Sequence, residues 1–354
     1  MSKDLMNSHL LARIALIILA LPTLLLSCTS ERTDTSEAPP YQIFAEPMMG
    51  TTIEVMVPEN EAAAAQAQAV FTLFNDIELR MSEWREGSPL AVVNQHAGGD
   101  PVPIPEDLLA VIQRGLALGD LTGGAFDITW AALWGLWDFK AEHPFVPDVE
   151  AIRARTALVD YKQLQVDDAA GTIRLPAEGM KIGLGGIAKG YALDRATALL
   201  KEKGVTSFLL SAGGQVYASG MRGDRKWRVG IRNPRGEIDD YFATMEVSDA
   251  SVSTSGDYER FFILDGIRYH HILDPRTGRP ARGLRSATVI SSDATLADAL
   301  STAFMVMGVD PALALAETLP DVEAVLIDAS NEVHTTSGMK NRLIVTHELP
   351  RLSP

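Results

Sequence analysis

The chain has 354 residues, of which 46% are hydrophobic and 22% charged, so it has the composition of a globular protein rather than a disordered one. Its formal net charge is −15, and an acidic protein is poorly suited to bind the phosphate backbone of nucleic acids. We therefore expect no nucleic-acid partner, and a phosphate-bearing ligand would need local positive charge.

The first residues resemble an export signal. A sparse basic start is followed by an apolar run over residues 14–26, which is too short for a comfortable membrane span. The run leads to Cys28, the only cysteine in the chain, in a context that resembles a bacterial lipoprotein cleavage box. We expect residues 1–27 to be a lipoprotein signal peptide and residues 28–40 a polar tether. Lipidation of Cys28 would then anchor the protein to a membrane of the bacterial cell envelope, facing the periplasm.

From Tyr41 onward the chain contains no repeat and no second clear linker, which predicts one domain over residues 41–350. Apolar residues with helical spacing predict several helices, and two β-rich runs around Asp265-Gly266 predict a hairpin. This mixture of hairpins and helices favours an α+β fold of mixed sheets and helices over a doubly wound sheet. The predicted helices span residues 62–79, 105–122, 188–203 and 291–308, and strands at 180–184 and 205–211 flank the third helix as a βαβ-like unit.

A glycine-rich stretch at the start of the third predicted helix, KIGLGGIAKGYALDR (181–195), has the features of a phosphate-binding turn. Glycines let backbone N–H groups approach an anion, and Lys189 adds a positive charge at a helix N-terminus. It is not a Walker loop, because Gly190 and not a hydroxyl residue follows the lysine. The acidic residue of a dinucleotide-binding fold is also missing from the next strand. On this stretch alone, an anion site and a tight structural turn remain equally open.

Two further clusters carry possible chemistry. Asp298, Ser301 and Thr302 share one face of the last predicted helix, and a carboxylate with hydroxyls suits a hard cation such as Mg²⁺. A satisfied Asp–Thr hydrogen bond on that face is the structural alternative. His270 and His271 lie in a strand and so face opposite sides, which means that at most one points into a given site. The sequence contains no zinc-binding spacing and no serine hydrolase motif.

Seven segments, taken together and in order, resemble the ApbE-type FAD:protein FMN transferases, which are exported and often lipid-anchored bacterial enzymes. The resemblance spans essentially all of the chain from Tyr41 to about Leu349. The segments are Met49–Thr51, Thr122–Thr129, Gly185–Asp194, Ser211–Gly220, Ser253–Phe262, His270–Pro280 and Ala297–Gly308.

The resemblance implies an activity. In this family Mg²⁺ assists the transfer of FMN from FAD, the substrate, to a threonine of an acceptor protein, with release of AMP. The expected partners are exported flavoproteins such as subunits of redox pumps. Two other functions stay open: a Mg²⁺-dependent periplasmic FAD pyrophosphatase that produces FMN and AMP, and a lipoprotein that binds flavin without catalysis.

The resemblance also implies roles for individual residues. Asp298 and Thr302 would be side-chain ligands of Mg²⁺, with Ser301 near them and the backbone carbonyl of Gly186 as a further ligand. His271 and Asp298 are the two candidates for the general base that accepts the threonine proton. Gly183 stands at a nucleotide-contacting position where the family often has an aspartate. The remaining expected FAD contacts are Met49, Trp84, Ala125, Phe126, Asp127, Lys189, His271 and Ile272.

Overall fold

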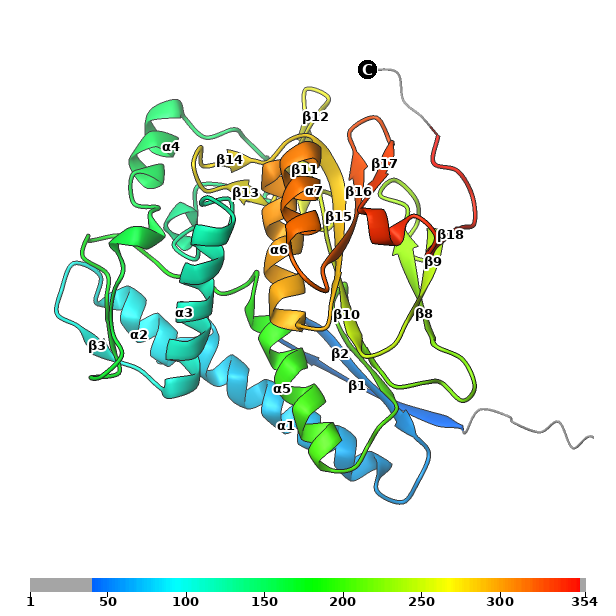
Figure 1. The fold of residues 1–354 in the computed structure, drawn as a ribbon. Coiled ribbons are helices and arrows are strands. Elements are labelled where there is room, and N and C mark those ends of the chain that lie inside the picture. The colour runs from blue at the N-terminus through cyan, green and yellow to red at the C-terminus, as the bar shows by residue number, and fades with distance from the viewer. Residues whose placement is uncertain (1–39, 351–354) are drawn as a thin grey trace, which may run out of the picture. The chain divides into compact units, whose positions relative to one another are not determined.

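An eight-stranded antiparallel sheet is the centre of the fold in the computed structural model, which describes residues 40–350 (Figure 1). The strand order is β1-β2-β6-β7-β10-β15-β16-β17, so neighbours in the sheet come from distant parts of the chain. The strands are β1 (Tyr41–Met48), β2 (Thr51–Pro58), β6 (Phe208–Ala212), β7 (Gln215–Ser219), β10 (Ala250–Gly256), β15 (Leu284–Ser291), β16 (Glu323–Asp328) and β17 (Val333–Thr335).

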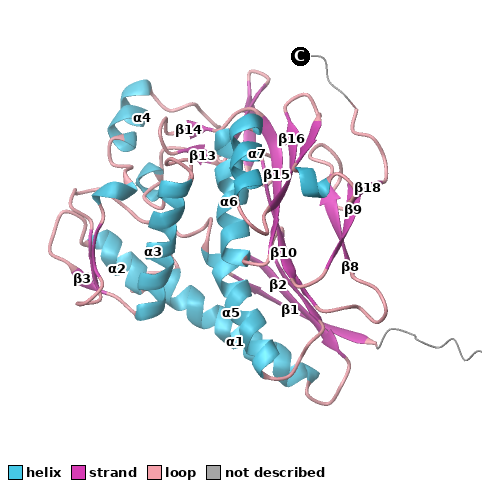
Figure 2. Cartoon of the chain, in the orientation of Figure 1, coloured by secondary structure: helices cyan, strands magenta, loops and turns pink. Residues whose placement is uncertain are grey.

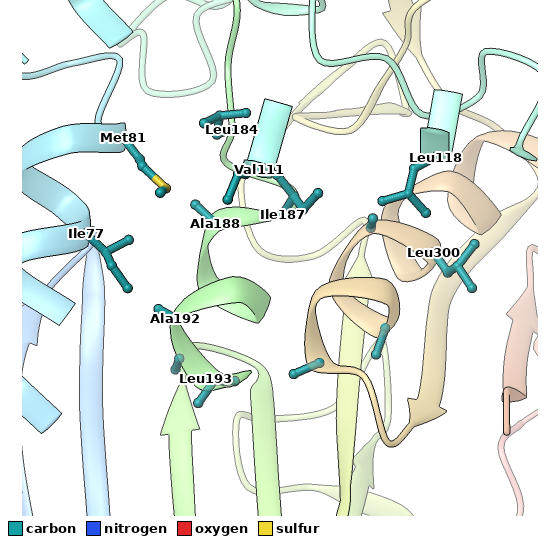
Figure 3. Close-up of a cluster of buried hydrophobic side chains, with 14 of the residues drawn as sticks. Ile77, Met81, Val111, Leu118, Leu184, Ile187, Ala188, Ala192, Leu193 and Leu300 are labelled. Carbon is teal, nitrogen blue, oxygen red and sulfur yellow. The ribbon is translucent and has the colours of Figure 1, made fainter. Parts of the chain in front are cut away.

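Helices cover one face of this sheet, and a small sheet covers part of the other (Figure 2). The helices α1, α5 and α6 contact the central sheet, while α3 packs beside them in the same apolar core (Figure 3). The helices are α1 (Ala63–Met81), α2 (Pro89–Gln95), α3 (Glu106–Leu121), α4 (Val149–Thr156), α5 (Ala188–Glu202), α6 (Ala294–Met307) and α7 (Val309–Thr318), with 3-10 turns at Ala131–Leu133, Tyr161–Gln163 and Ser337–Met339.

The small sheet has three strands in the order β18-β9-β8, and a second apolar core lies between it and the central sheet. Trp227 and Ile231 of the small sheet pack there against Val252 and Ile290 of the central sheet. The small sheet consists of β8 (Trp227–Arg232), β9 (Tyr241–Val247) and β18 (Leu343–Val345). The other strands are β3 (Val102–Pro103), β4 (Gln165–Asp167), β5 (Thr172–Arg174), β11 (Phe261–Leu264), β12 (Ile267–His270), β13 (Leu273–Asp274) and β14 (Arg279–Pro280).

The α+β fold predicted from the sequence is confirmed, and the long helices begin and end within about two residues of the expected positions for α1, α3, α5 and the end of α6. Asp293 caps α6 by accepting a hydrogen bond from Leu296 N at 2.7 Å, and Gly308 ends it with φ of +80°. The predicted hairpin is also present, because Asp265 and Gly266 adopt the positive φ values of a tight turn between β11 and β12.

The predicted βαβ-like unit is wrong, because residues 180–184 do not form a strand. Met180, Ile182 and Leu184 are buried, as a core strand would be, but Gly183 between them is buried as well. The main chain of Ile182 is paired with a side chain: Asn94 Oδ1 accepts from its N–H at 2.7 Å, and Asn94 Nδ2 donates to its carbonyl at 2.9 Å. On its other edge the segment makes only an isolated parallel bridge between Lys181 and Trp130, so no strand forms, and α5 connects an irregular segment to the antiparallel strand β6.

No helix within residues 40–350 is long and apolar enough to cross a membrane. The predicted signal peptide, Cys28 and nearly all of the predicted tether lie outside the described residues.

Helices α5 and α6 pack closely because residue 190 is glycine. A Cβ at Gly190 would lie 2.3 Å from the carbonyl oxygen of Ala294 and 2.8 Å from Cβ of Asp298. We expect Gly190→Ala to lower the free energy of unfolding by about 1–3 kcal/mol, since overpacking forces the backbone of the two helices apart. Urea unfolding measures this effect. The exposed substitution Ala198→Ser in the same helix is the control, and equal stability of both variants would contradict close packing.

Candidate active site

A cavity of about 1150 Å³ opens where the hairpins β1–β2 and β6–β7 turn, at the end of the central sheet. Its volume exceeds the range of roughly 300–1,000 Å³ that is usual for small-molecule sites, so it has room for a large ligand. Its walls come from these hairpins, the C-terminal end of α1, residues 125–130, the start of α5, and parts of β8, β10 and α6.

Three of the four predicted metal ligands lie on the wall of this cavity: Gly186, Asp298 and Thr302. Asp298 is only 5% exposed, and one of its oxygens accepts a hydrogen bond from Gly190 N at 3.0 Å. A Cβ at Gly186 would lie 3.4 Å from Thr302 Oγ1, so the absence of a side chain leaves space beside that hydroxyl. A buried carboxylate, a hydroxyl and an accessible main chain around such a space fit a hard cation.

Ser301 is fully buried behind this group and does not line the cavity. Its hydroxyl donates to the carbonyl oxygen of Asp298 at 2.8 Å and lies 2.9 Å from Ser255 Oγ. Ser255 Oγ also lies 3.3 Å from Thr302 Oγ1. Ser301 therefore connects α6 to β10 and holds the neighbouring hydroxyls in place.

A second group with metal-binding side chains lies on the β16–β17 hairpin, away from this cavity. Asp328, Glu332 and His334 offer ligand atoms within 4.8 Å of one another. The carboxylate of Asp328 already accepts hydrogen bonds from the backbone of Ser330 and Glu332, and His334 Nε2 lies 3.0 Å from it. These contacts, which hold the turn together, make the group a structural element of the hairpin.

Lys189 and the first turn of α5 supply positive charge to the cavity. Lys189 Nζ donates to the carbonyl of Gly185 at 3.0 Å, and both residues line the wall. The preceding turn lies at the N-terminus of α5, where backbone N–H groups and the helix dipole favour an anion. Ala188 N donates to the carbonyl of Leu184 and Gly190 N to Asp298, so Lys189 is the main source of positive charge at this turn.

Glu83 lies on the same wall as Lys189, and sequence reasoning missed it. Burial raises the pKa of its carboxyl to about 7, while its own backbone N–H, that of Leu184 and the charge of Lys189 act in the opposite direction. A carboxyl with such a pKa is partly protonated near neutral pH. Nothing in its local sequence predicts this, because residues far along the chain bury the side chain.

Most of the predicted FAD contacts also line the cavity, including Met49, Ile272 and the segment 125–127. The carboxylate of Asp127 is occupied locally: it accepts hydrogen bonds from the backbone N–H and hydroxyl of Thr129 at 2.7 and 2.6 Å. It also accepts from Tyr161 N, and burial raises its pKa. The side chain of Asp127 thus fixes the shape of this wall.

Trp84 and Gly183, the other two predicted nucleotide contacts, differ in their position relative to the cavity. Trp84 lines the cavity and stacks on Trp134 with ring centroids 3.9 Å apart, yet it is 71% exposed, so much of its ring is open to a ligand. Gly183 is not among the lining residues. Trp130 Nε1 donates to its carbonyl at 3.0 Å, and a Cβ there would lie 2.9 Å from Ala131 Cβ. Glycine at 183 therefore permits close packing behind the wall.

The two histidines separate as the strand geometry predicts. His270 is buried, and its Nε2 lies 2.8 Å from the carbonyl of Ala281. His271 lines the cavity, and its Nδ1 is buried without a hydrogen-bond partner among residues 40–350. Burial, followed by the charge of Arg260, lowers the pKa of His271 to about 4. The imidazole is therefore neutral at pH 7.

This lowered pKa predicts a dependence of stability on pH. Because the folded protein binds the His271 proton less tightly than the unfolded chain, the stability present above about pH 6.5 should decline as the pH falls toward 4. In the variant His271→Gln the free energy of unfolding should decline less steeply with falling pH. The difference in slope corresponds to as much as about one bound proton. Urea unfolding at several pH values tests this, with the surface variant His143→Gln as control. Identical slopes for wild type and His271→Gln would contradict the assignment.

Comparison with known proteins places this site in a family. Residues 49–326 match the ApbE family. An FAD:protein FMN transferase from Treponema pallidum (strain Nichols) is 36% identical over 319 residues, covering 85% of this chain and 88% of the relative. One from Vibrio cholerae is 31% identical, covering 86% and 93%. The crystal structure of the ApbE protein from Thermotoga maritima has a TM-score of 0.78 and 35% identity, covering 85% and 98%. The chain therefore belongs to the ApbE family and is an enzyme of the transferase class.

Proposed function

We propose that this protein transfers FMN from FAD to a threonine hydroxyl of an acceptor protein, in a Mg²⁺-dependent reaction that releases AMP. The names of the relatives supply the reaction class. The observation that carries the proposal is that Asp298 and Thr302 line the same cavity as Lys189 and His271. A metal-binding face, a phosphate-binding cation and a free base are the groups that phosphoryl transfer requires.

Asp298, Thr302 and the carbonyl of Gly186 would hold Mg²⁺, which when bound supplies positive charge to the pyrophosphate of FAD. Lys189, which lines the same cavity, would bind these phosphates as well. Trp84 offers its exposed ring for stacking on part of the FAD. Together these groups fix the position of the pyrophosphate, and positioning carries most of the catalysis in reactions of this type.

The chemical step exchanges one phosphate bond for another. The threonine oxygen attacks the phosphorus of the FMN half and forms a phosphoester, and the bond from this phosphorus to the bridging oxygen breaks. The bridging oxygen leaves with AMP. The hydroxyl proton passes to the imidazole of His271, which lines the cavity. Asp298 is less available to accept the proton, because Gly190 N already donates to one of its oxygens and the metal would take the other.

We also propose that the protein works on the periplasmic side of the cell envelope, anchored through a lipid on Cys28, with exported flavoproteins such as redox-pump subunits as acceptors. The support is the sequence alone: an apolar export segment that leads directly to the single cysteine. Mass spectrometry of the membrane-extracted protein would detect a lipid on Cys28.

The assigned metal role predicts that Asp298→Ala abolishes FMN transfer. The full chain in detergent would be mixed with FAD, Mg²⁺ and an acceptor domain, and the mass of the acceptor, free FMN and AMP would be followed. Wild type should add the mass of an FMN ester and release AMP, and Asp298→Ala should lose at least about a hundredfold of this rate, which corresponds to a few kcal/mol. Asp310→Ala, an exposed acidic position on α7, is the matched control.

Other outcomes of this assay decide against the proposal. Free FMN and AMP with an unmodified acceptor would indicate a pyrophosphatase, and intact FAD in the presence of Mg²⁺ would indicate a flavin-binding protein only. Transfer by Asp298→Ala at the wild-type rate would refute the metal assignment.

Stacking on Trp84 predicts a moderate effect on FAD affinity. We expect Trp84→Ala to weaken binding by about 2- to 12-fold, since an aromatic pair contributes about 0.5–1.5 kcal/mol beyond buried area. Trp84→Phe should retain most of the affinity. Flavin fluorescence titration measures both values, and equal affinity of wild type and Trp84→Ala would show that the ring does not contact FAD.

A further inference from the structure

Strand β8 is an edge strand whose open side faces the candidate active site. It is the last strand in the order β18-β9-β8, so β9 pairs with only one of its sides. Arg228, Val229, Gly230 and Arg232 of this strand all line the same cavity as Asp298 and Thr302. An edge strand presents unpaired N–H and C=O groups, which are a template for another strand. Here that template lies within the cavity wall.

The cavity extends beside β8 as an arm. The floor of this arm is the face of the central sheet that the helices do not cover. Glu54 of β2 is paired with Ser211 of β6, and both line the cavity together with Leu209. The intervening residues Ile53 and Val55 are fully buried in the core on the helical side. The arm therefore lies beside β8, over β2 and β6, and is continuous with the part of the cavity that holds the metal-binding face.

The rim of the arm carries exposed apolar and cationic side chains. Ile238 is 76% exposed and Tyr241 is 47% exposed, and both line the cavity. Arg228 is exposed as well, opposite Glu246 of β9. Arg232 stacks over Tyr258, with its guanidinium carbon 4.8 Å from the ring centroid. Exposed tyrosine, isoleucine and arginine around an open strand edge are typical of a surface that binds a polypeptide.

We propose that the flavin-accepting segment of the acceptor protein binds in this arm as an extended strand along the open edge of β8. The inference rests on the proposed function and identifies the surface that the protein substrate uses. Main-chain hydrogen bonds to β8 supply affinity that is independent of sequence, as in other cases of strand addition. Ile238 and Tyr241 contact apolar side chains of the segment, and Arg228 favours a segment that carries a carboxylate.

This placement also explains why the cavity is larger than one small ligand requires. The part near Asp298, Lys189 and His271 holds the pyrophosphate of FAD, while the arm beside β8 holds the acceptor. A segment bound beside β8 would present its hydroxyl side chain to the part of the cavity that holds the pyrophosphate. Each substrate thus has its own part of the cavity.

The first test is the charge reversal Arg228→Glu in the full chain, with the same acceptor domain. We expect the KM for the acceptor to rise about tenfold, while the affinity for FAD in the absence of acceptor changes less than twofold. Arg153→Glu, an exposed reversal on α4, is the matched control and should behave as wild type. Thermal unfolding of the three proteins checks that folding is unchanged.

The second test measures the main-chain contacts directly. Hydrogen exchange of the peptide that contains β8 should slow severalfold when acceptor is added to the FAD-bound protein, and not when FAD is added alone.

The outcomes separate the two proposals. Protection of β8 by FAD alone, or equal acceptor KM values for Arg228→Glu and Arg153→Glu, would overturn the docking surface while transfer by wild type still stands. Failure of wild type to modify any acceptor would overturn the proposed function, and the docking surface with it.

Discussion

The contact between α5 and α6 is the constraint on which the site depends. Gly190 allows the helices to approach, and Asp194 of α5 accepts hydrogen bonds from the backbone N–H groups of Ala294 and Thr295 at 2.9 and 2.8 Å. A carboxylate at the start of α6 also faces the positive end of that helix. Because α5 carries Lys189 and α6 carries Asp298, a shift of one helix along the other would separate the proposed phosphate-binding and metal-binding groups. The packing of two helices therefore sets the geometry of the chemistry.

The electrostatics of the cavity follow from burial as much as from the number of charges. A protein with a net charge of −15 must concentrate positive charge where a pyrophosphate binds. The charge of Lys189 lowers the pKa of the Glu83 carboxyl, but burial has the larger effect and raises this pKa to about 7. The Glu83 carboxyl is therefore partly neutral near physiological pH. A bound pyrophosphate would raise that pKa further, because like charges repel. Lys189 thus keeps its positive charge available for the substrate.

Sequence reasoning succeeded where the signal is local and failed where it is not. The helices α1, α3, α5 and α6 were predictable because apolar periodicity lies within each segment, and a local cap, Asp293, adds to the signal for α6. The spacing of Asp298 and Thr302 places both on one helix face. Residues 180–184 were misassigned because Asn94 supplies the hydrogen bonds that a strand would make. Glu83 and the edge of β8 gain their chemistry only from segments that are distant in sequence, so no local pattern indicates them.

Because the cavity lies at the ends of the strands, binding of the acceptor there would both promote transfer of FMN and suppress hydrolysis of FAD. The cavity reaches residues on both faces of the central sheet, from Asp298 on the helical side to Val229 on the side of the small sheet. The β6–β7 turn at Gly213-Gly214 has positive φ at both residues, and its lack of side chains lets Thr51 of the neighbouring hairpin pack against it where the two faces meet. An acceptor strand along β8 would bring a hydroxyl past this turn and, at the same time, cover the opening through which water enters. Docking of the protein substrate would therefore supply the nucleophile and exclude its competitor in one step.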